Sequence, residues 1–558
     1  AHQRHMDLKK FNSLLDLFFD QVKKQDSDSI FLEWLNPKNK KKFTWPETSL
    51  NIYKLANILK ENLNEGDRCL LVSENRPEWL ISDLAIMLAG GITVPAYTTY
   101  TENDYKFLIE DCQPSVILLS GQEMHKKLKN TIKEKIFIKK VITFEKIEND
   151  NKNKYLDFQS IIGKNLLENE KIKNLNIKRT SPACIIYTSG TGGNPKGVIL
   201  SHGGILNNCE GAIEILKPLI KKDQTRFLTW LPLSHSYEHT VQFVQITVAA
   251  RVFYAESIEK LIKNMNDCRP EIMTAVPRFY QNLYQKINAS FNKATGVKKV
   301  LIQKMLNLGL KKIKKEPLNF IEKIQDRILE KIVRKKIKAQ FGGSLKTFVS
   351  GGGALDKEVG FFLNAIGLPT LQGYGLTETS PVVSCNPIND IRVETVGPPF
   401  KGNEVKIAED GEILVKGENV MLGYWNNKEE TDKVLKNGWL HTGDIGVFEN
   451  NYLKITDRKK DILITPGGDN ISPLKIENEL INSEIIDQAI VYGDNKPYLV
   501  ALLVLNDEKK SSTEEEIKQE IEKVNKKLSK IENIKKFFTI NEKFSIENGM
   551  LTPTLKLK

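Results

Sequence analysis

The chain has 558 residues, of which 40% are hydrophobic, with 21 prolines, 35 glycines and a formal net charge of +12. This composition is typical of a globular protein and excludes a disordered or collagen-like chain. The length predicts more than one domain, because domains usually hold about 150 residues. No apolar run reaches the roughly 20 residues needed to cross a bilayer, and the six cysteines are widely spaced. We therefore expect a cytoplasmic protein with reduced thiols, without a disulfide framework or a zinc site.

The first half of the chain predicts a parallel sheet. The five residues before Met6 are interpreted as a cloning remnant, so the first domain is taken to begin at residue 6. The segment from Leu80 to Tyr97 is predicted to be a buried helix followed by a strand. From about residue 50 to 460, continuous apolar runs alternate with helical patterns, as in α/β proteins. The predicted strands include Arg68–Ser73, Ser115–Leu119, Ala183–Tyr187, Arg251–Tyr254 and Thr347–Val349.

A loop of small and hydroxyl-bearing residues follows the strand Ala183–Tyr187, with the sequence TSGTGGNPKG. Glycines allow the backbone to approach a ligand closely, and successive N–H groups can bind an anion. Lys196 adds a positive charge, but it follows Pro195, so the loop departs from the Walker pattern. A tight turn is the structural alternative. The combination of a strand end, hydroxyl groups and a lysine favours phosphate binding.

A basic segment between Lys298 and Lys338 holds 14 Lys/Arg against 4 Asp/Glu and so carries most of the net charge. Its apolar residues recur at intervals of three and four, which predicts amphipathic helices in an insertion at about 279–341. The simpler interpretation is a solvated face on helices packed against the main domain. Peripheral contact with an anionic membrane surface is the alternative. Nucleic acid is a weaker one, because no recognised binding module accompanies the charge.

Two more strands end in glycines. The sequence Val349-Ser-Gly-Gly-Gly-Ala354 is followed by QGYGLTET at 372–379. Glycine turns at the carboxyl ends of parallel strands are where α/β proteins bind ligands. Tyr374 offers a flat face for a purine, Thr377 a hydroxyl, and Glu378 an oxygen ligand suited to Mg²⁺ shared with phosphates. The alternative for Glu378 is a cap or an ion pair on a surface loop.

Beyond Gly411 the pattern changes to short strands with turns. Within GWLHTGD, Asp444 can accept hydrogen bonds from both hydroxyls of a ribose, and Arg458 can donate a fork of them to ribose or phosphate. Alone, each would more often form a structural ion pair. After a charged cluster at Arg458–Lys460, two strands and a helix rich in Glu and Lys predict a compact α+β unit. The predicted elements are Glu412–Lys416, Trp439–His441, Tyr452–Thr456, Gln488–Tyr492, Leu499–Leu505 and the helical Ser512–Lys530.

Together and in this order, these segments resemble the adenylate-forming (AMP-binding) superfamily of acyl-CoA synthetases, adenylation domains and luciferases. The resemblance extends from Asn75-Arg-Pro-Glu-Trp79 to Thr552–Lys558. Gly192 stands where the family usually has threonine, and Asp457 replaces a usual glycine, as in its long-chain branch. The implied fold is α/β, with a large multilayer N-terminal domain of packed sheets and a distorted β-barrel at 6–459. A small mobile α+β C-terminal domain follows at 460–558.

The resemblance also implies roles for individual residues. Lys556 would bind the carboxylate and the α-phosphate, His235 would border the acyl carboxylate, and Thr191 and Glu378 would position Mg²⁺. Lys460 would be the hinge of the small domain. Rotation about it would bring Gly467 and Gly468 toward the coenzyme A thiol. The ATP-binding residues implied are Thr188, Ser189, Gly190, Thr191, Gly192, Gly193, Lys196, Gly352, Gly353, Gln372, Gly373, Tyr374, Gly375, Thr377, Asp444 and Arg458.

The activity implied is ATP-dependent activation of a long-chain fatty acid to acyl-AMP, followed by transfer to coenzyme A. The helical insertion and the sequence LPLSHSYEH at 231–239 resemble bacterial long-chain fatty acid ligases. An acyl-AMP ligase that loads a carrier protein and an aryl or medium-chain acid:CoA ligase are the alternatives. A non-catalytic, membrane-associated nucleotide sensor is more remote, because Lys556, Glu378 and Asp444 are all present.

Overall fold

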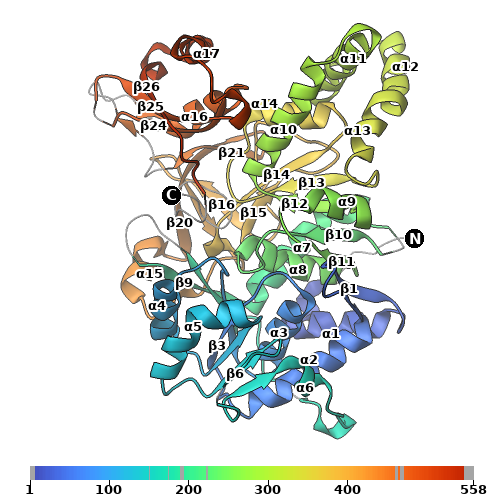
Figure 1. Cartoon of the computed structure of the whole chain (residues 1–558), viewed down its shortest axis with the longest axis vertical. Coiled ribbons are helices and arrows are strands. Elements are labelled where there is room, and N and C mark those ends of the chain that lie inside the picture. Colours follow the sequence, from blue (N-terminus) through green and yellow to red (C-terminus); the bar gives the residue numbers. More distant parts are fainter. Residues whose placement is uncertain are drawn as a thin grey trace.

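The structure is a computed structural model that describes residues 7–149, 151–173, 175–188, 194–221, 224–458, 463–464, 470–494 and 496–545. Two large sheets with helices between and around them form the body of the molecule, and a smaller α/β unit lies above them in Figure 1. The α/β class with several packed sheets and a smaller C-terminal unit, as predicted, is confirmed. The domain boundary near residue 459 stays a prediction.

The first sheet has eight strands in the order β18-β9-β8-β4-β3-β5-β6-β7, and its centre is parallel. Its strands are β3 (Arg68–Val72), β4 (Ile92–Ala96), β5 (Val116–Leu119), β6 (Lys140–Thr143), β7 (Tyr155–Asp157), β8 (Pro182–Thr188), β9 (Lys196–Ser201) and β18 (Gly423–Tyr424). The associated helices are α2 (Trp45–Lys60), α3 (Pro77–Leu88), α4 (Glu102–Cys112), α5 (Gln122–Glu134) and α6 (Phe158–Ile162). The helix and strand predicted between Leu80 and Tyr97 are α3 and β4.

The second sheet also has eight strands, in the order β15-β14-β13-β12-β10-β11-β1-β2, with antiparallel strands only at its edges. Its strands are β1 (Ile30–Trp34), β2 (Lys41–Thr44), β10 (Arg226–Thr229), β11 (Arg251–Tyr254), β12 (Ile272–Ala275), β13 (Thr347–Ser350), β14 (Thr370–Gly375) and β15 (Val382–Cys385). The helices beside it are α1 (Leu14–Lys24), α7 (His202–Leu216), α8 (Ser236–Thr247), α9 (Leu261–Cys268) and α14 (Lys357–Ala365).

Helices α3, α7 and α8 form the centre of the main core. Every residue of α3 is buried, and α7 and α8 are buried along most of their lengths. A helix that is buried all round belongs to the interior of a large domain. The same hydrophobic cluster includes residues of both large sheets, so these helices join the sheets into one body.

A smaller antiparallel sheet closes one side of this body. It consists of β16 (Glu404–Ile407), β17 (Glu412–Lys416), β19 (Leu435–Lys436), β20 (Trp439–Glu449) and β21 (Tyr452–Arg458), with α15 (Lys428–Val434) beside it. Strand β20 is longer than the predicted Trp439–His441, because it continues through Asp444 to pair with β21.

The basic insertion is helical, as its periodicity predicts. It contains α10 (Pro277–Asn292), α11 (Gly296–Ile313), α12 (Phe320–Leu329), a π-helical turn (Glu330–Arg334) and α13 (Lys335–Ala339). Figure 1 shows α11 and α12 side by side, projecting from the body next to the C-terminal unit. Among the described helices, none combines the length and the apolar character needed to cross a bilayer.

The C-terminal unit has its own core around a three-stranded sheet. Its elements are β22 (Leu463–Ile464), β23 (Asn470–Ile471), α16 (Pro473–Ile481), β24 (Ile486–Tyr492), β25 (Leu499–Leu505), α17 (Glu514–Lys526) and β26 (Ile534–Ile540). It contacts the large body through polar groups. Gln285 Nε2 donates to the Ile481 carbonyl at 2.6 Å, and Asn482 Nδ2 donates to Asp356 Oδ2 at 2.8 Å.

Candidate active site

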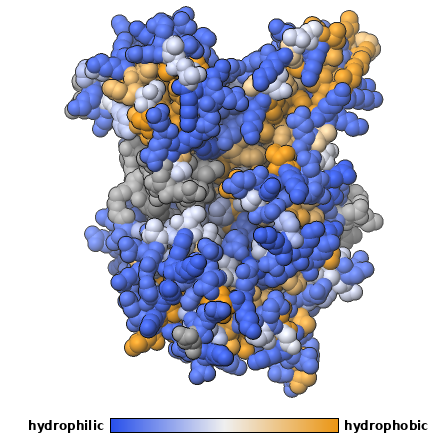
Figure 2. All heavy atoms as spheres, in the orientation of Figure 1, coloured by the Kyte–Doolittle hydropathy of each residue, from blue (hydrophilic) through white to orange (hydrophobic). Residues whose placement is uncertain are grey.

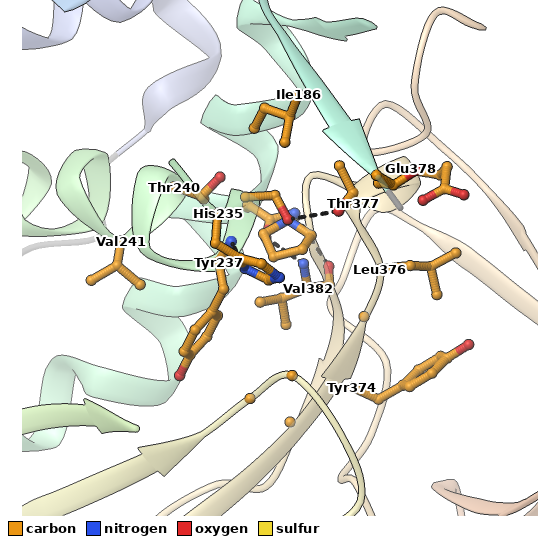
Figure 3. Close-up of a pocket in the computed structure, with 18 of the residues that line it drawn as sticks. Ile186, His235, Tyr237, Thr240, Val241, Tyr374, Leu376, Thr377, Glu378 and Val382 are labelled. Carbon is orange, nitrogen blue, oxygen red and sulfur yellow. Dashed lines mark hydrogen bonds between the residues drawn. The ribbon is translucent and has the colours of Figure 1, made fainter. Parts of the chain in front are cut away.

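A cavity of about 1000 Å³ lies between the carboxyl ends of β13 and β14, the end of β8, and strand β20. Figure 3 shows side chains from α8, from β14 and from the turn after β14 around this space. Its wall is polar at one end and apolar at the other. Because strand ends of a parallel sheet converge here, the position is the one expected for ligand binding in an α/β protein.

Glycines at the strand ends keep the cavity open. Gly351 and Gly352 follow β13, and a Cβ atom on Gly351 would lie only 2.7 Å from the ring of Tyr237. Gly352 has φ of +79°, which favours glycine. A Cβ atom on Gly375, at the end of β14, would collide with the Pro381 carbonyl. Larger residues at these positions would displace the walls of the cavity.

His235 lies in the middle of the cavity wall, at the N-terminus of α8. Its Nδ1 accepts a hydrogen bond from the Tyr237 backbone N–H at 3.2 Å, so the histidine caps the helix. Since Nδ1 is an acceptor, the neutral ring carries its proton on Nε2. Ser236 Oγ and Thr377 Oγ1 are 3.1 Å apart, which ties this helix end to the turn after β14. His235 is thus both a cap and a cavity residue.

Glu378 lies on the 3₁₀ turn Thr377–Thr379 and lines the polar end. Its Oε2 accepts a hydrogen bond from the Tyr424 hydroxyl at 2.9 Å. Burial, and then the charge of Glu378, raise the pKa of Tyr424, so this hydroxyl stays a donor. A carboxylate has about four acceptor positions, so the bond from Tyr424 leaves Glu378 with capacity to bind a cation.

Lys196 lies close to Glu378, beside the same tyrosine. Its Nζ is 3.2 Å from Glu430 Oε2 and 5.0 Å from the centre of the Tyr424 ring. Lys433 and Lys436 also line the cavity, and Lys433 Nζ lies 2.8 Å from the other carboxylate oxygen of Glu430. Three lysines around one polar pocket favour an anionic ligand.

The far side of the polar end is formed by β14 and β20. The Tyr374 hydroxyl donates to Asp444 Oδ2 at 2.5 Å, and Asp444 is opposite Arg458 in the pairing of β20 with β21. Glu412 accepts a hydrogen bond from the Gly443 N–H at 2.9 Å and lies 3.3 Å from His441 Nδ1. Carboxylates at this position could accept hydrogen bonds from sugar hydroxyls.

The other end of the cavity is an apolar arm that runs beside helix α7. It begins near Asn208, which hydrogen-bonds the Val382 backbone, and extends along α7 to Leu216. Eight residues of helix span about 12 Å. Gly211 lies on the same helix, and a Cβ atom there would collide with the ring of Phe400, which lines the cavity. The apolar arm comprises Ala212, Ile215, Leu216, Phe227, Val241, Val244 and Ile272.

The cavity brings together most of the predicted site residues that the structure describes. These are Thr188, Lys196, His235, Gly352, Gly373, Tyr374, Gly375, Thr377, Glu378 and Asp444. Gly353 and Gln372 do not line it, although each directly adjoins a residue that does. Of Arg458, the structure describes the backbone position alone. The residues Ser189, Gly190, Thr191, Gly192, Gly193, Lys460, Gly467, Gly468 and Lys556 lie outside the described residues, so their roles stay predictions.

Several cavity residues were not predicted. Tyr97 and Tyr100 follow β4, and Glu412 and His441 come from the antiparallel sheet. His441 lies within the GWLHTGD segment, where a polar side chain next to a predicted ligand-binding aspartate was a usable signal. The apolar arm had no local signal, because its residues are ordinary core types on α7, α8, β10 and β12.

Within the described part of the chain, no group of three or more His, Cys, Asp or Glu side chains could hold a metal ion by itself. Glu378 is the carboxylate at the polar end that could share a cation with a bound phosphate. Mg²⁺ is usually held in this way, by one or two carboxylates together with substrate phosphates.

Comparison with known proteins agrees with this geometry. The AMP-binding enzyme family matches residues 18–425, and the AMP-binding enzyme C-terminal domain matches residues 460–544. The chain is 31% identical over 529 residues to the long-chain-fatty-acid–CoA ligase FadD15 of Mycobacterium bovis, covering 90% of this chain and 87% of that protein. It is 32% identical to long-chain-fatty-acid–CoA ligase 5 of Rattus norvegicus, covering 88% and 77%.

Solved structures share the fold. The anthranilate CoA ligase AuaEII in complex with anthranoyl-AMP superposes with a TM-score of 0.78 at 19% identity, covering 99% of this chain and 97% of that one. The o-succinylbenzoate coenzyme A synthetase of Bacillus subtilis, in complex with AMP, gives a TM-score of 0.71 at 21% identity, covering 98% and 97%. From the family match and the shared fold, we conclude that the chain belongs to the AMP-binding enzyme family.

Proposed function

We propose that this protein is an acid–thiol ligase that activates a long-chain fatty acid with ATP and transfers the acyl group to coenzyme A. The observation that carries the proposal is the cavity itself, in which a polar, lysine-rich end continues into an apolar arm. The two ends fit a nucleotide and an acyl chain, and His235 lies where the two would meet. The named activities of the FadD15 and ligase 5 relatives support the same choice of substrate.

The first step would join the acid to AMP. A carboxylate oxygen attacks the α-phosphorus of ATP, the new O–P bond forms, and the bond to pyrophosphate breaks. Repulsion between anions opposes this approach, so positioned cations and donors are the main source of acceleration. Lys196 lies at the phosphate end. The Nε2–H group of His235 would donate a hydrogen bond to the carboxylate of the acid. Lys556 would contribute a further positive charge.

The second step would use the same cavity. The sulfur of coenzyme A, after losing its proton to solvent, attacks the acyl carbonyl, and AMP leaves as the C–O bond breaks. Asp444 and Tyr374 would hold the ribose and adenine in both steps. Rotation of the C-terminal unit about Lys460 would bring Gly467 and Gly468 toward the thiol, as the resemblance implies.

Magnesium would be held by Glu378 and Thr191 together with the phosphates. The carboxylate of Glu378 fits this ion, because it lines the lysine-rich end and keeps acceptor capacity beside the Tyr424 hydroxyl. When bound, the ion would neutralise charge on the departing pyrophosphate.

Glu430 has a related role in the proposal. It now forms the ion pair with Lys196, so nucleotide phosphates would replace it as the partner of this lysine.

The proposal also includes a location. The protein would act in the cytoplasm and touch the inner membrane face through its basic insertion, as one interpretation of the sequence predicts. No partner other than these small molecules and a lipid surface is proposed.

The deciding experiment is acid-dependent pyrophosphate release with ATP and Mg²⁺, across fatty acids of increasing chain length. Each reaction is run with and without coenzyme A, and the thioester is identified by mass. Long-chain acids should give the highest kcat/KM and a thioester product. Release that stalls until a carrier protein is added would instead indicate an acyl-AMP ligase, and a preference for aryl or medium-chain acids would contradict the proposed substrate. ATP binding without release for any acid would favour a nucleotide sensor.

A further inference from the structure

The outer face of helix α12 is apolar, although it is exposed. Phe320, Ile321, Ile324, Ile328 and Ile332, here called the apolar ridge, have side chains that are 43% to 77% exposed. Phe320, Ile324, Ile328 and Ile332 are spaced by four positions, so they form one line along the helix and its π-helical extension. Figure 2 shows hydrophobic residues gathered at the edge of the molecule where α12 lies in Figure 1.

A line of cations runs beside the apolar ridge. Lys323, Arg327, Lys331 and Lys335, here called the basic line, are also spaced by four and are all exposed. Each follows a ridge residue by three positions, and residues three apart are neighbours on a helix surface, so the two lines occupy adjacent stripes. Apolar and cationic stripes in this arrangement are typical of helices that lie in the interface of an anionic membrane.

The acidic side chains of the same helices are engaged elsewhere. Glu322 Oε2 is 2.8 Å from Lys311 Nζ, and Asp326 Oδ2 is 2.7 Å from Lys312 Nζ, so both carboxylates face helix α11. Glu330 pairs with Arg334 at 3.2 Å. Within the described residues, no ion pair involves a member of the basic line. The outward charge of the insertion is therefore almost entirely positive.

The inner face of the insertion is fixed to the body of the protein. Arg334 is buried, and its guanidinium donates to the Ala365 and Met305 carbonyls, each at 3.1 Å, and to Asp326 Oδ1 at 2.7 Å. Helix α11 packs so closely on α14 that a Cβ atom on Gly309 would collide with the Ala365 carbonyl. Leu329 and Ile337 are buried in the same core. The exposed ridge is thus held on a rigid support and has no alternative site in this core.

We infer that the apolar ridge and the basic line dock the protein onto the surface of an anionic lipid bilayer. The ridge would enter the boundary between headgroups and acyl chains, and the basic line would contact the lipid phosphates. A second copy of the chain is a poorer occupant, because two-fold pairing through this face would oppose two positive lines. A nucleic acid would pair with the cations and leave the apolar ridge uncovered. The inference rests on the membrane contact proposed above and assigns its surface, and it uses no residue of the cavity, so its test is independent of the proposed ligase activity.

Vesicle sedimentation with the full chain tests this inference. Phosphatidylcholine vesicles with and without phosphatidylglycerol are compared at low and high salt. We expect binding to the anionic vesicles, weakened by salt because the charges are screened, and little binding to the neutral ones. The double variant Phe320→Ser with Ile324→Ser removes apolar groups from the ridge. It should lower the fraction of protein bound to anionic vesicles about tenfold. The triple change Lys323→Gln, Arg327→Gln and Lys331→Gln should lower it by a similar factor.

Matched controls distinguish binding through this surface from nonspecific binding to vesicles. Ile136 and Leu167 are exposed apolar residues elsewhere, and Lys518 and Lys526 are exposed cations on α17. The double variant Ile136→Ser with Leu167→Ser should leave vesicle binding unchanged, and so should Lys518→Gln with Lys526→Gln. Circular dichroism should show that every variant is folded. Unchanged binding in the ridge variant would overturn the inference, and so would self-association through the ridge without vesicle binding. Neither readout depends on catalysis, so a failure of the proposed activity would not affect this test.

Discussion

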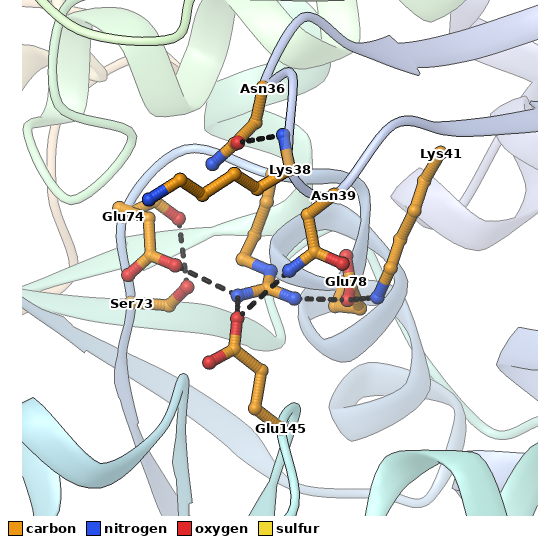
Figure 4. A network of polar contacts seen from close by, with 9 residues as sticks. Asn36, Lys38, Asn39, Lys41, Ser73, Glu74, Glu78 and Glu145 are labelled. Atoms are coloured by element: carbon orange, nitrogen blue, oxygen red, sulfur yellow. Dashed lines mark hydrogen bonds and ion pairs between the residues drawn. The ribbon is translucent and has the colours of Figure 1, made fainter.

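In the second sheet, β13 and β14 end in glycines and leave a cavity, whereas in the first sheet β3, β5 and β6 end around a buried arginine. Arg76 follows β3, is fully buried, and contacts the carboxylates of Glu74, Glu78 and Glu145, which Figure 4 labels. Its Nη1 lies 2.8 Å from Glu74 Oε1 and 3.0 Å from Glu145 Oε1, and its Nη2 lies 2.7 Å from Glu78 Oε2. Both edges lie at the carboxyl ends of parallel strands, but one holds an open cavity and the other a buried network of ion pairs.

The arginine network places two cations and three carboxylates in contact at this edge. Lys41 Nζ adds a second contact to Glu78 at 2.6 Å, and the guanidinium of Arg76 lies 4.3 Å from the centre of the Trp34 ring. Burial alone would raise the pKa of Glu78, but Arg76 and Lys41 lower it, so the carboxylate is ionised. The planar, always charged guanidinium suits such a buried site better than an ammonium group would. The comparison teaches that a strand end becomes a candidate site when small residues leave room for a ligand and charged side chains such as Lys196 and Glu378 line that room.

The largest effect is expected at the closed edge. Arg76→Met would leave Glu78 buried without its main partner, and the free energy of unfolding of the large body should fall by about 3–5 kcal/mol. Urea unfolding followed by tryptophan fluorescence measures this change. The double variant Arg76→Met with Glu78→Gln should recover part of the loss, because it also removes the buried charge.

The same variant also tests whether the closed edge binds a substrate. The KM values for ATP and coenzyme A should be unchanged in folded Arg76→Met protein. A raised KM for either one would show that Arg76 belongs to a ligand site, and the contrast between the two sheets would then be wrong.

At the open edge the corresponding change is Glu378→Gln, which should leave stability nearly unchanged and lower kcat/KM for pyrophosphate release about 10²–10³-fold. Loss of a metal-binding carboxylate removes several kcal/mol of stabilisation from the transition state. Glu418→Gln is a suitable control, because Glu418 is paired with Arg179 and does not line the cavity. A Glu378→Gln variant with full activity would exclude the proposed role.

The contrast between the two edges could be only partly predicted from the sequence. Strands such as Arg251–Tyr254 and Leu499–Leu505 were predicted at their observed bounds, because continuous apolar runs between polar turns have one stable arrangement in a sheet. The glycine-rich ends of β13 and β14 were predicted to bind a ligand for the same local reason. Asn75–Trp79 is one of the motifs in the sequence, but Arg76 pairs with Glu145, which lies 69 positions further along the chain. Such long-range pairing has no local signature.

The apolar arm was the part of the site that sequence reasoning could not locate, and it gives the next prediction. Ala212→Phe would fill the arm one helical turn beyond Asn208, so kcat/KM for long-chain acids should fall about tenfold or more relative to medium-chain acids. The ratio of kcat/KM across a chain-length series measures this change. Ala339→Phe, on the exposed end of α13, is the control. An unchanged ratio in Ala212→Phe would mean that the acyl chain lies elsewhere.

The last and most gradual effect, spread over several pH units, concerns a second buried glutamate, which contrasts with Glu78. Burial raises the pKa of Glu238 to about 8, and its Oε2 accepts a hydrogen bond from Thr274 Oγ1 at 2.7 Å, behind the cavity wall. The folded protein therefore keeps this carboxyl protonated up to about pH 8, whereas the unfolded chain releases the proton above about pH 4.5. Because the unfolded state binds fewer protons in this interval, stability should fall as pH rises from about 4.5 to 8, by at most about 1.4 kcal/mol per pH unit.

Glu238→Gln isolates this contribution, since a neutral amide does not titrate. The difference in unfolding free energy between Glu238→Gln and wild type should grow in favour of the variant from pH 5 to pH 8 and then level off. His239 adds a similar trend to both proteins. Burial would lower its pKa, but Asp83 at 2.8 Å raises it to about 10, so its contribution is lost as pH rises toward that value and cancels in the difference. A difference that shrinks with rising pH would show that Glu238 is ionised like Glu78, and the two buried carboxyls would then have the same charge state despite their different partners.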